Sequence, residues 1–443
     1  MMTDHRISRR SFAGGAAAAF AFTILPGRAR GANERVNVAC IGVGGKGRGE
    51  VSDVSEAGGN IVALCDVDLD RISGRDDPRQ AHPDAKFYAD FRRMLDEMDR
   101  QVDAVTISTP DHTHFHPALK AIRMGKHVYC QKPLTHSIWE ARTLAEEART
   151  HGVATQMGNQ AHAGEPIRRG VEYIRAGLIG TVREVHTWTN RPIWPQGMGS
   201  PPEPEEVPET LDWDLWLGPA AGRPYSPAYV PFNWRGWWDF GTGALGDMGC
   251  HIMDMPFWAL DLDAPTGFDA TSEGNTPLSG PTASTVSYTF APGEYSGDLV
   301  YTWSDGGRMP PDEAFSGFDL PKEQIARRFD LVMIGDKGKL LFSRGRTEWL
   351  TAPGALLEEF EAPEPTIPRV PNEDAEWLEA CKGGPPALSN FDYSGPLTEF
   401  VLLGNLAIRL GRPLSWDSRG LRCPDAPEAE ALIRREYRKG WEA

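Results

Sequence analysis

The feature that most constrains the fold of this chain is a glycine-rich turn between a buried strand and a helical run. The apolar run Val36–Gly42 has the composition of a buried strand, and Gly42, Gly44 and Gly47 follow in a Gly-x-Gly-x-x-Gly pattern that also includes Gly45. Such glycines allow a tight turn and the close approach of a pyrophosphate to the N-terminus of the next helix. The pattern therefore indicates a dinucleotide-binding turn.

The next apolar run strengthens this interpretation. Residues 60–65 read as a second strand, and Asp66 follows it about twenty residues after the turn, where an acid binds ribose hydroxyls. A carboxylate there would repel a 2′-phosphate, so we expect NAD, with NADP less favoured. Asp66, Asp68 and Asp70 alternate, and we interpret them as one ligand and two solvated loop acids.

The alternation of strands and helices continues and predicts a parallel sheet. Strands are expected at 102–108 and 126–130, and Lys132 follows the second of them. Ligands of such sheets bind at the carboxyl ends of the strands, so Lys132 should direct a cation into the cleft. His112, His114 and His116 straddle a helix start, which disfavours a metal site, and we predict none.

A second motif lies in the middle of the chain, in the apolar stretch 243–258. Asp247, His251, Asp254 and Trp258 are spaced to share one face of a helix. One interpretation is a buried helix whose ionisable groups satisfy each other. We favour function, because burying three such groups is costly and a histidine beside carboxylates can take a proton from a hydroxyl.

The N-terminus and the net charge bear on location and partners. Arg9 and Arg10 precede a short apolar run, which predicts a twin-arginine export signal over residues 1–32 and a periplasmic protein. The alternatives are an uncleaved anchor and a chance match. The run is too short for a membrane span. The chain carries −16, and the signal +4 (five Arg, one Asp), which leaves −20 for the mature chain and disfavours nucleic acid and anionic membranes. The six cysteines show no disulfide pattern.

Taken in order, these motifs resemble those of the Gfo/Idh/MocA oxidoreductases. The resemblance rests on the glycine turn, Thr109-Pro110 with His114, Lys132-Pro133 and Asp247-x-x-x-His251. It implies an α/β Rossmann domain joined to an α+β domain with a large, open, mainly antiparallel sheet. We assign residues 33–157 to the first domain and 158–443 to the second.

The resemblance also implies roles for individual residues. Lys132, His251 and Asp247 would be catalytic, with His251 as acid and base. Asp254 would hold a substrate hydroxyl, and Asn159 and Gln160 would face the same cleft. The predicted cofactor ligands are Gly42, Gly44, Gly45, Gly47, Asp66, Thr109, Pro110, His114, Gln131 and Lys132. Gln131 departs from the usual Glu, which removes an anion next to Lys132 and should change the pH dependence of the reaction.

A Trp- and Pro-rich insert at 190–240 is expected in the second domain. Its rings predict either a local packed cluster or a carbohydrate platform, and Trp194 and Trp238 are the favoured substrate contacts. Further strands are expected at 182–189, 283–290, 295–303, 329–334 and 339–342. The C-terminal helices, the last at 428–439, show no chemistry.

These observations predict an exported, NAD-dependent oxidoreductase that acts on a sugar, glycoside or polyol and keeps its nicotinamide tightly bound. One alternative is glycoside cleavage by transient oxidation and elimination, and another is a non-catalytic NAD- or sugar-binding protein. The resemblance also implies a homodimer or homotetramer. The twin-arginine export machinery would be a partner.

Overall fold

The computed structural model describes residues 35–344 and 349–443. The predicted signal, with Arg9 and Arg10, lies outside the described residues. Among the described residues, no helix combines the length and apolar character that crossing a membrane requires. All six cysteines lie in the described residues, and no disulfide joins any two of them.

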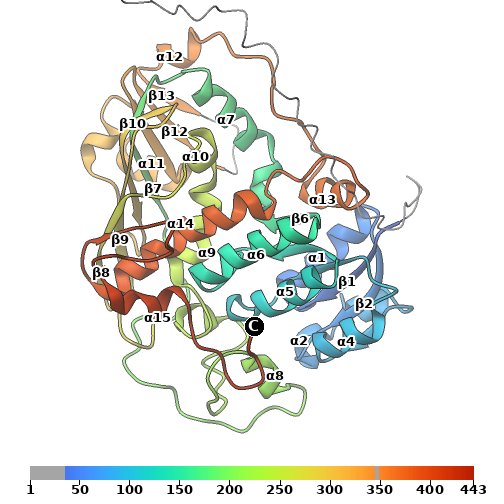
Figure 1. The fold of residues 1–443 in the computed structure, drawn as a ribbon. Helices are drawn as coiled ribbons and strands as arrows, with labels where there is room; N and C mark the ends of the chain where they lie inside the picture. Colours follow the sequence, from blue (N-terminus) through green and yellow to red (C-terminus); the bar gives the residue numbers. More distant parts are fainter. Residues whose placement is uncertain (1–34, 345–348) are drawn as a thin grey trace, which may run out of the picture. The chain divides into compact units, whose positions relative to one another are not determined.

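The first part of the chain forms a six-stranded parallel sheet (Figure 1). Its strands lie in the order β3-β2-β1-β4-β5-β6, so the order reverses beside β1, where doubly wound sheets bind their ligands. The strands are β1 Asn37–Ile41, β2 Asn60–Cys65, β3 Lys86–Tyr88, β4 Ala104–Ile107, β5 His127–Gln131 and β6 Thr155–Gly158.

Each face of this sheet is covered by its own set of helices. In β1, Ala39 and Ile41 belong to one hydrophobic core, and Val38 and Cys40 belong to another, as the period of two in a strand requires. The first core includes residues of α4 Phe91–Met98, α5 Phe115–Arg123 and α6 Ile138–His151. The second includes residues of α1 Lys46–Glu56 and α13 Glu373–Cys381. Helix α13 thus packs on the first sheet although it falls in the predicted second domain, whose boundaries stay a prediction.

The second sheet has eight strands in the order β13-β12-β11-β7-β10-β9-β8-β14. All neighbouring pairs are antiparallel except β7 and β10, which run parallel. The expected antiparallel sheet is confirmed, with additional strands β8, β13 and β14. The strands are β7 Val182–Trp188, β8 Gly267–Glu273, β9 Ala283–Phe290, β10 Ser296–Ser304, β11 Leu331–Gly335, β12 Lys339–Phe342, β13 Leu350–Ala352 and β14 Leu414–Ser415.

The two faces of this sheet have different covers. The inner face packs on α7 Glu165–Arg175, α9 Gly243–Ile252, α10 Asp254–Ala259 and α14 Phe391–Leu410. On the opposite face, Trp188, Val332 and Leu341 pack against η4 Asp312–Phe315 and α11 Lys322–Arg328. Of these helices, α14 contacts strands of both sheets, and it also packs on α9, which carries Asp247 and His251.

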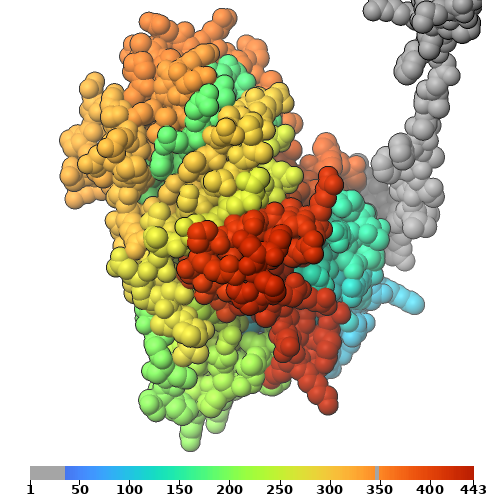
Figure 2. All heavy atoms as spheres, turned by 60° about the vertical axis from the view of Figure 1, so that its left-hand side comes forward, coloured from blue at the N-terminus to red at the C-terminus, as the bar shows by residue number. Residues whose placement is uncertain are grey.

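Helix α14 joins the two parts of the molecule. It packs against α6 of the first part and against α9 and β8 of the second. An ion pair between Arg142 on α6 and Glu399 on α14, 2.6 Å apart, ties the two helices. Figure 2 shows this last part of the chain, in orange-red and red, between the yellow strands and the green-blue helices.

The C-terminal segment differs from the predicted helix at 428–439. Only η5 Pro427–Ala429 and α15 Glu430–Ile433 are helical, and Arg434 is extended. The physical reason is that the aromatic residues beyond bind separate partners. Tyr437 donates to Glu140, which also closes the capping box of α6, and the carbonyl of Trp441 contacts His116. The remaining short helices are α2 Leu69–Ile72, α3 Pro78–Ala81, η1 Asp111–Thr113, η2 Gln160–Ala163, α8 Trp213–Leu217, η3 Asn233–Gly236 and α12 Ala355–Glu358.

Candidate active site

The glycine turn after β1 is packed so closely that side chains would not fit. A Cβ on Gly47 would lie 1.7 Å from the carbonyl oxygen of Gly42. A Cβ on Gly42, whose φ is +76°, would lie 2.8 Å from the backbone of Ser108 at the end of β4. The backbone of the turn thus packs against the end of β4, beside the point where the strand order reverses. The N-terminus of α1 is left open to a cavity, as the binding of a pyrophosphate requires.

Asp66 fixes this turn from the neighbouring strand. Its Oδ2 accepts hydrogen bonds from the backbone N–H groups of Val43 at 2.8 Å and Gly44 at 3.0 Å. Burial raises the pKa of Asp66, and the N–H donors of Asp68, Val43 and Gly44 oppose that rise. Asp66 lines the cavity, so its carboxylate both holds the turn and is available to a bound ribose.

Arg71 is a cavity residue that sequence reasoning missed. A Cβ on Gly44 would lie 2.6 Å from the Arg71 side chain, and one on Gly45 would lie 3.0 Å from its guanidinium. The cation therefore lies over the turn, beside the start of α1, where a pyrophosphate carries its charge. Its position five residues after Asp66, in the short helix α2 that follows β2, was the available signal.

One cavity of about 580 Å³ collects the main predicted residues. Lys132 from the end of β5 and Asp247 and His251 from α9 line it together with the glycine turn and Asp66. The Lys132 ammonium donates to the Asp247 backbone carbonyl at 2.7 Å and to its Oδ1 at 3.1 Å. Residues far apart in the sequence thus form one polar group at the boundary between the two sheets.

The charges in this group set the protonation of the motif. Burial opposes ionisation of Asp247, but Lys132 and Arg235 outweigh it and lower its pKa to about 2. Burial, with the charges of Lys132 and Arg344, lowers the pKa of His251 well below its usual value. The histidine is therefore a neutral imidazole at neutral pH, and it makes no hydrogen bond within the described part of the chain. It is free to accept a proton.

Other predicted residues support the cavity from its floor. Thr109, Pro110, Gln131 and Gln160 line it, and Gln160 donates to Gln131 Oε1 at 3.4 Å. His114 lies behind, with its ring nitrogens 2.8 Å from the carbonyl oxygens of Pro133 and Thr109. It joins the loop after β4 to the end of β5.

Asp254 is predicted as a substrate ligand, but the structure places it outside this cavity. Its carboxylate is buried, 3.0 Å from His162 Nδ1, and accepts a hydrogen bond from Tyr393 at 2.7 Å. The helix predicted through 258 is interrupted at Met253, because Pro256 has no N–H for the carbonyl of Ile252. Asp254 therefore begins a separate helix, α10, and does not continue the line of Asp247 and His251. Trp258 stacks on His162, with ring centroids 4.2 Å apart.

Three further predicted substrate contacts also lie away from the cavity lining. Asn159 is buried, and its Oδ1 accepts from Ser389 at 2.7 Å. Trp194 is buried and donates to Gln196. Trp238 is buried and donates to the Thr276 carbonyl, with Arg409 over its ring. Packing and local hydrogen bonds account for these positions.

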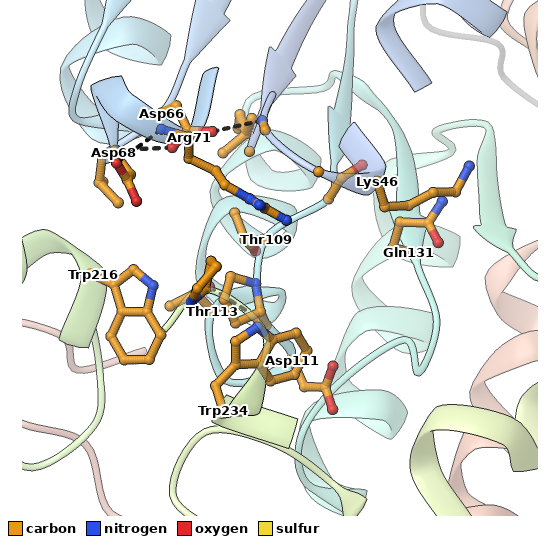
Figure 3. A pocket seen from close by; sticks show the side chains of 18 of the residues that line it. Lys46, Asp66, Asp68, Arg71, Thr109, Asp111, Thr113, Gln131, Trp216 and Trp234 are labelled. Atoms are coloured by element: carbon orange, nitrogen blue, oxygen red, sulfur yellow. Dashed lines mark hydrogen bonds between the residues drawn. The ribbon is translucent and has the colours of Figure 1, made fainter. Parts of the chain in front are cut away.

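The 190–240 insert forms a wall of the cavity. Most of its aromatic rings form a local core that includes Trp213, Trp216, Trp234 and Trp237. The insert docks on the first sheet's loops, where Leu69 N–H donates to the Thr210 carbonyl at 2.9 Å. Figure 3 shows Trp216 and Trp234 facing Asp66 and Arg71 across the cavity.

The C-terminus adds a second cover that the sequence did not predict. Trp441 lines the same cavity, and its carbonyl is 2.7 Å from His116 Nε2. The Arg438 N–H donates to the carbonyl of Pro219 in the insert. The segment after α15 thus covers the end of the cavity at the glycine turn, whereas the C-terminal helices place no residue in the described lining.

A Rossmann sheet, a glycine turn that excludes side chains, and a Lys–Asp–His group beside it define a nucleotide-binding oxidoreductase. The profile of an oxidoreductase family with an NAD-binding Rossmann fold, Gfo/Idh/MocA, matches residues 36–159, and that of its C-terminal alpha/beta domain matches residues 175–293. The chain belongs to the Gfo/Idh/MocA oxidoreductase family, and its first domain is NAD-binding.

Individual relatives agree with this assignment. The chain is 30% identical over 154 residues to an inositol 2-dehydrogenase of Burkholderia multivorans, which is 34% of this chain and 44% of that protein. It is 31% identical over 160 residues to a glycosyl hydrolase family 109 protein of Solibacter usitatus, 33% of this chain and 35% of that protein. The matches thus span less than half of each relative.

A solved structure extends the likeness of fold over most of the chain. The WlbA dehydrogenase of Bordetella pertussis, crystallised with NADH and UDP-GlcNAcA, superposes with a TM-score of 0.60 at 14% identity. The superposition covers 87% of this chain and 99% of the other. At this identity the likeness concerns the fold.

Proposed function

We propose that this protein is an NAD-dependent oxidoreductase that oxidises a hydroxyl of a sugar, glycoside or polyol. The observation that carries the proposal is the meeting of neutral His251, Lys132 and Asp247 in the cavity that also contains the glycine turn. The relative named as an inositol 2-dehydrogenase supports the substrate class.

The residues divide the work between proton and charge. His251 accepts the proton of the substrate hydroxyl, because its imidazole is neutral and without another hydrogen bond. Lys132, held by Asp247, presents its remaining N–H to the oxygen and stabilises the negative charge that develops there. Bound NAD supplies the acceptor for the hydride of the carbinol carbon.

We further propose that the nucleotide stays bound between turnovers, reoxidised by a second sugar or by return of the hydride. The insert and Trp441 both wall the cavity, which supports slow release. The test is to pass the purified protein through gel filtration, denature it and quantify the released nucleotide. We expect about one NAD per chain, and a Trp216→Ala variant should retain less because it opens the wall. Wild-type protein that emerges without nucleotide contradicts retention.

A second candidate is glycoside cleavage through a transient ketone, which acidifies the neighbouring C–H and allows elimination of the glycosidic oxygen. The relative named as a glycosyl hydrolase family 109 protein favours it. Release of free reducing sugar from a glycoside, with no net change in the nicotinamide absorbance, selects this reaction over net oxidation.

Export and assembly are also proposals. Arg9-Arg10 and the apolar run behind them support twin-arginine export to the periplasm, and replacement of both arginines by lysine should keep the protein in the cytoplasmic fraction. Accumulation of that variant in the periplasm contradicts export by this route. The resemblance supports a homodimer or homotetramer, and light scattering of a monomer in solution would contradict it.

A further inference from the structure

The carboxylate of Asp247 lies among more positive charge than it neutralises. Lys132 Nζ is 3.1 Å and Arg235 Nε 3.3 Å from Oδ1, and Arg191 Nε is 3.8 Å from Oδ2. Arg191 is too far for a hydrogen bond, and its guanidinium makes none within the described residues. Three cations therefore face one carboxylate, and among the described residues the Arg191 guanidinium has no hydrogen-bond acceptor.

Arg344 adds a fourth cation from the adjacent strand end. Its charge acts on Asp247 and on His251, and its Nη1 is buried with no hydrogen-bond partner among the described residues. Two further carboxylates among the described residues interact with these cations: Asp330 with Arg344, and Asp111 with Arg235 and Lys132. Even with all three carboxylates ionised, the four cations leave a net positive charge.

The fold holds these arginines in position. Strands β7 and β12 both run antiparallel to β11, so the segments that follow them, with Arg191 and Arg344, leave the same edge of the sheet. Arg235 comes from η3, and its guanidinium lies 4.2 Å from the ring centroid of Trp234 and 4.7 Å from that of Phe232. The charge of a bound dinucleotide would be met elsewhere, at the glycine turn, where the Arg71 side chain lies beside Gly44 and Gly45.

We propose that the substrate is an acidic sugar whose anionic substituent binds to Arg191 and Arg235. This rests on the proposed function, since the sugar must place its hydroxyl at His251. Guanidinium groups bind carboxylate, sulfate and phosphate groups through pairs of charge-assisted hydrogen bonds. A neutral sugar would cover the same cations without supplying a partner, which costs free energy.

The test measures by calorimetry how tightly matched sugars bind to the NAD-loaded protein. Each pair consists of a methyl glycoside and the corresponding methyl glycosiduronate, in gluco, galacto or manno configuration. The corresponding 6-sulfates and 6-phosphates are measured in the same way. We expect at least one acidic sugar to bind about tenfold or more tightly than its neutral counterpart. Arg191→Gln should weaken binding of that acidic sugar on the order of 10- to 100-fold, and it should not weaken binding of the neutral sugar. Arg191→Lys should restore part of the preference.

The matched control is Arg308→Gln, because Arg308 also follows a strand of this sheet but pairs with Glu273 at 2.7 Å. It should leave both affinities unchanged. A wild-type protein that binds no acidic sugar more tightly than its neutral counterpart overturns the proposal, as does an Arg191→Gln variant that keeps the preference. Binding preference and hydride transfer are separate readouts, so acid preference without hydride transfer would overturn the proposed function alone. Turnover of neutral sugars without acid preference would overturn this inference alone.

Discussion

Replacement of Asp247 by Asn removes the carboxylate charge that Lys132, Arg191 and Arg235 face. The folded protein lowers the pKa of Asp247 from 3.8 to about 2. Each unit is worth about 1.4 kcal/mol, so the ionised carboxylate contributes between about 2 and 3 kcal/mol to the free energy of unfolding. Because the folded pKa lies below the unfolded value, this contribution is present above pH 3.8 and is lost as the pH falls towards 2. Asp247→Asn should therefore be less stable by about that amount at neutral pH.

Urea unfolding followed by tryptophan fluorescence measures this difference. It should be full at neutral pH and should shrink by roughly half at about pH 3. The same variant should transfer hydride about 10²-fold more slowly, because Lys132 loses the partner that orients it. Asp269→Asn is the control, since Asp269 is exposed on β8. Equal stability of Asp247→Asn and wild type at neutral pH would refute the reasoning.

Three further predictions concern titratable groups and their neighbours. The acid limb of the pH–rate profile should lie below pH 6.5, because burial and Lys132 lower the pKa of His251, and a limb above that value would contradict a neutral base. Burial, with Glu50 and Glu373, raises the pKa of Asp374 to about 8, so wild-type stability should fall as the pH rises from 3.8 towards 8. The free energy of unfolding of Asp374→Asn, measured with urea, should change less with pH over this range than that of the wild type. An identical pH dependence in both proteins would contradict the assignment. Gln131→Glu should shift the pH–rate profile, because it adds a carboxylate to the cavity lining, and an unchanged profile would argue against a role for residue 131.

Local patterns were sufficient for the first sheet and for the two motifs that line the cavity. The glycine turn and Lys132 each follow a predicted strand, and a parallel sheet brings the carboxyl ends of its strands to one edge. Asp247 and His251 are one helical turn apart, so they line the same cavity. Asp254 lies outside the cavity although helical spacing predicts it on the same face as Asp247 and His251, because Pro256 interrupts the helix.

The remainder depends on contacts between distant segments. The site includes residues from three distant segments: Arg235 from the insert, Arg191 after strand β7, and Trp441 near the C-terminus. No periodicity within those segments indicates that they meet at the site. Tryptophan-rich sequence was compatible with a sugar platform or a packed cluster, and only the mutual packing of the rings decides for a cluster at most positions. The strand β14, two residues long, lies below what an alternating pattern can reveal.

The most direct test of the account is the near-ultraviolet absorbance of reduced nicotinamide when the purified, NAD-loaded protein is mixed with a panel of neutral and acidic sugars in a single turnover. A subset of sugars should produce the reduced-nicotinamide band in the wild type, and His251→Ala, with its nucleotide still bound, should not produce it. An equal band in both proteins would show that His251 is not the base. The absence of a band and of any glycoside cleavage for every sugar would contradict sugar redox chemistry in this cavity.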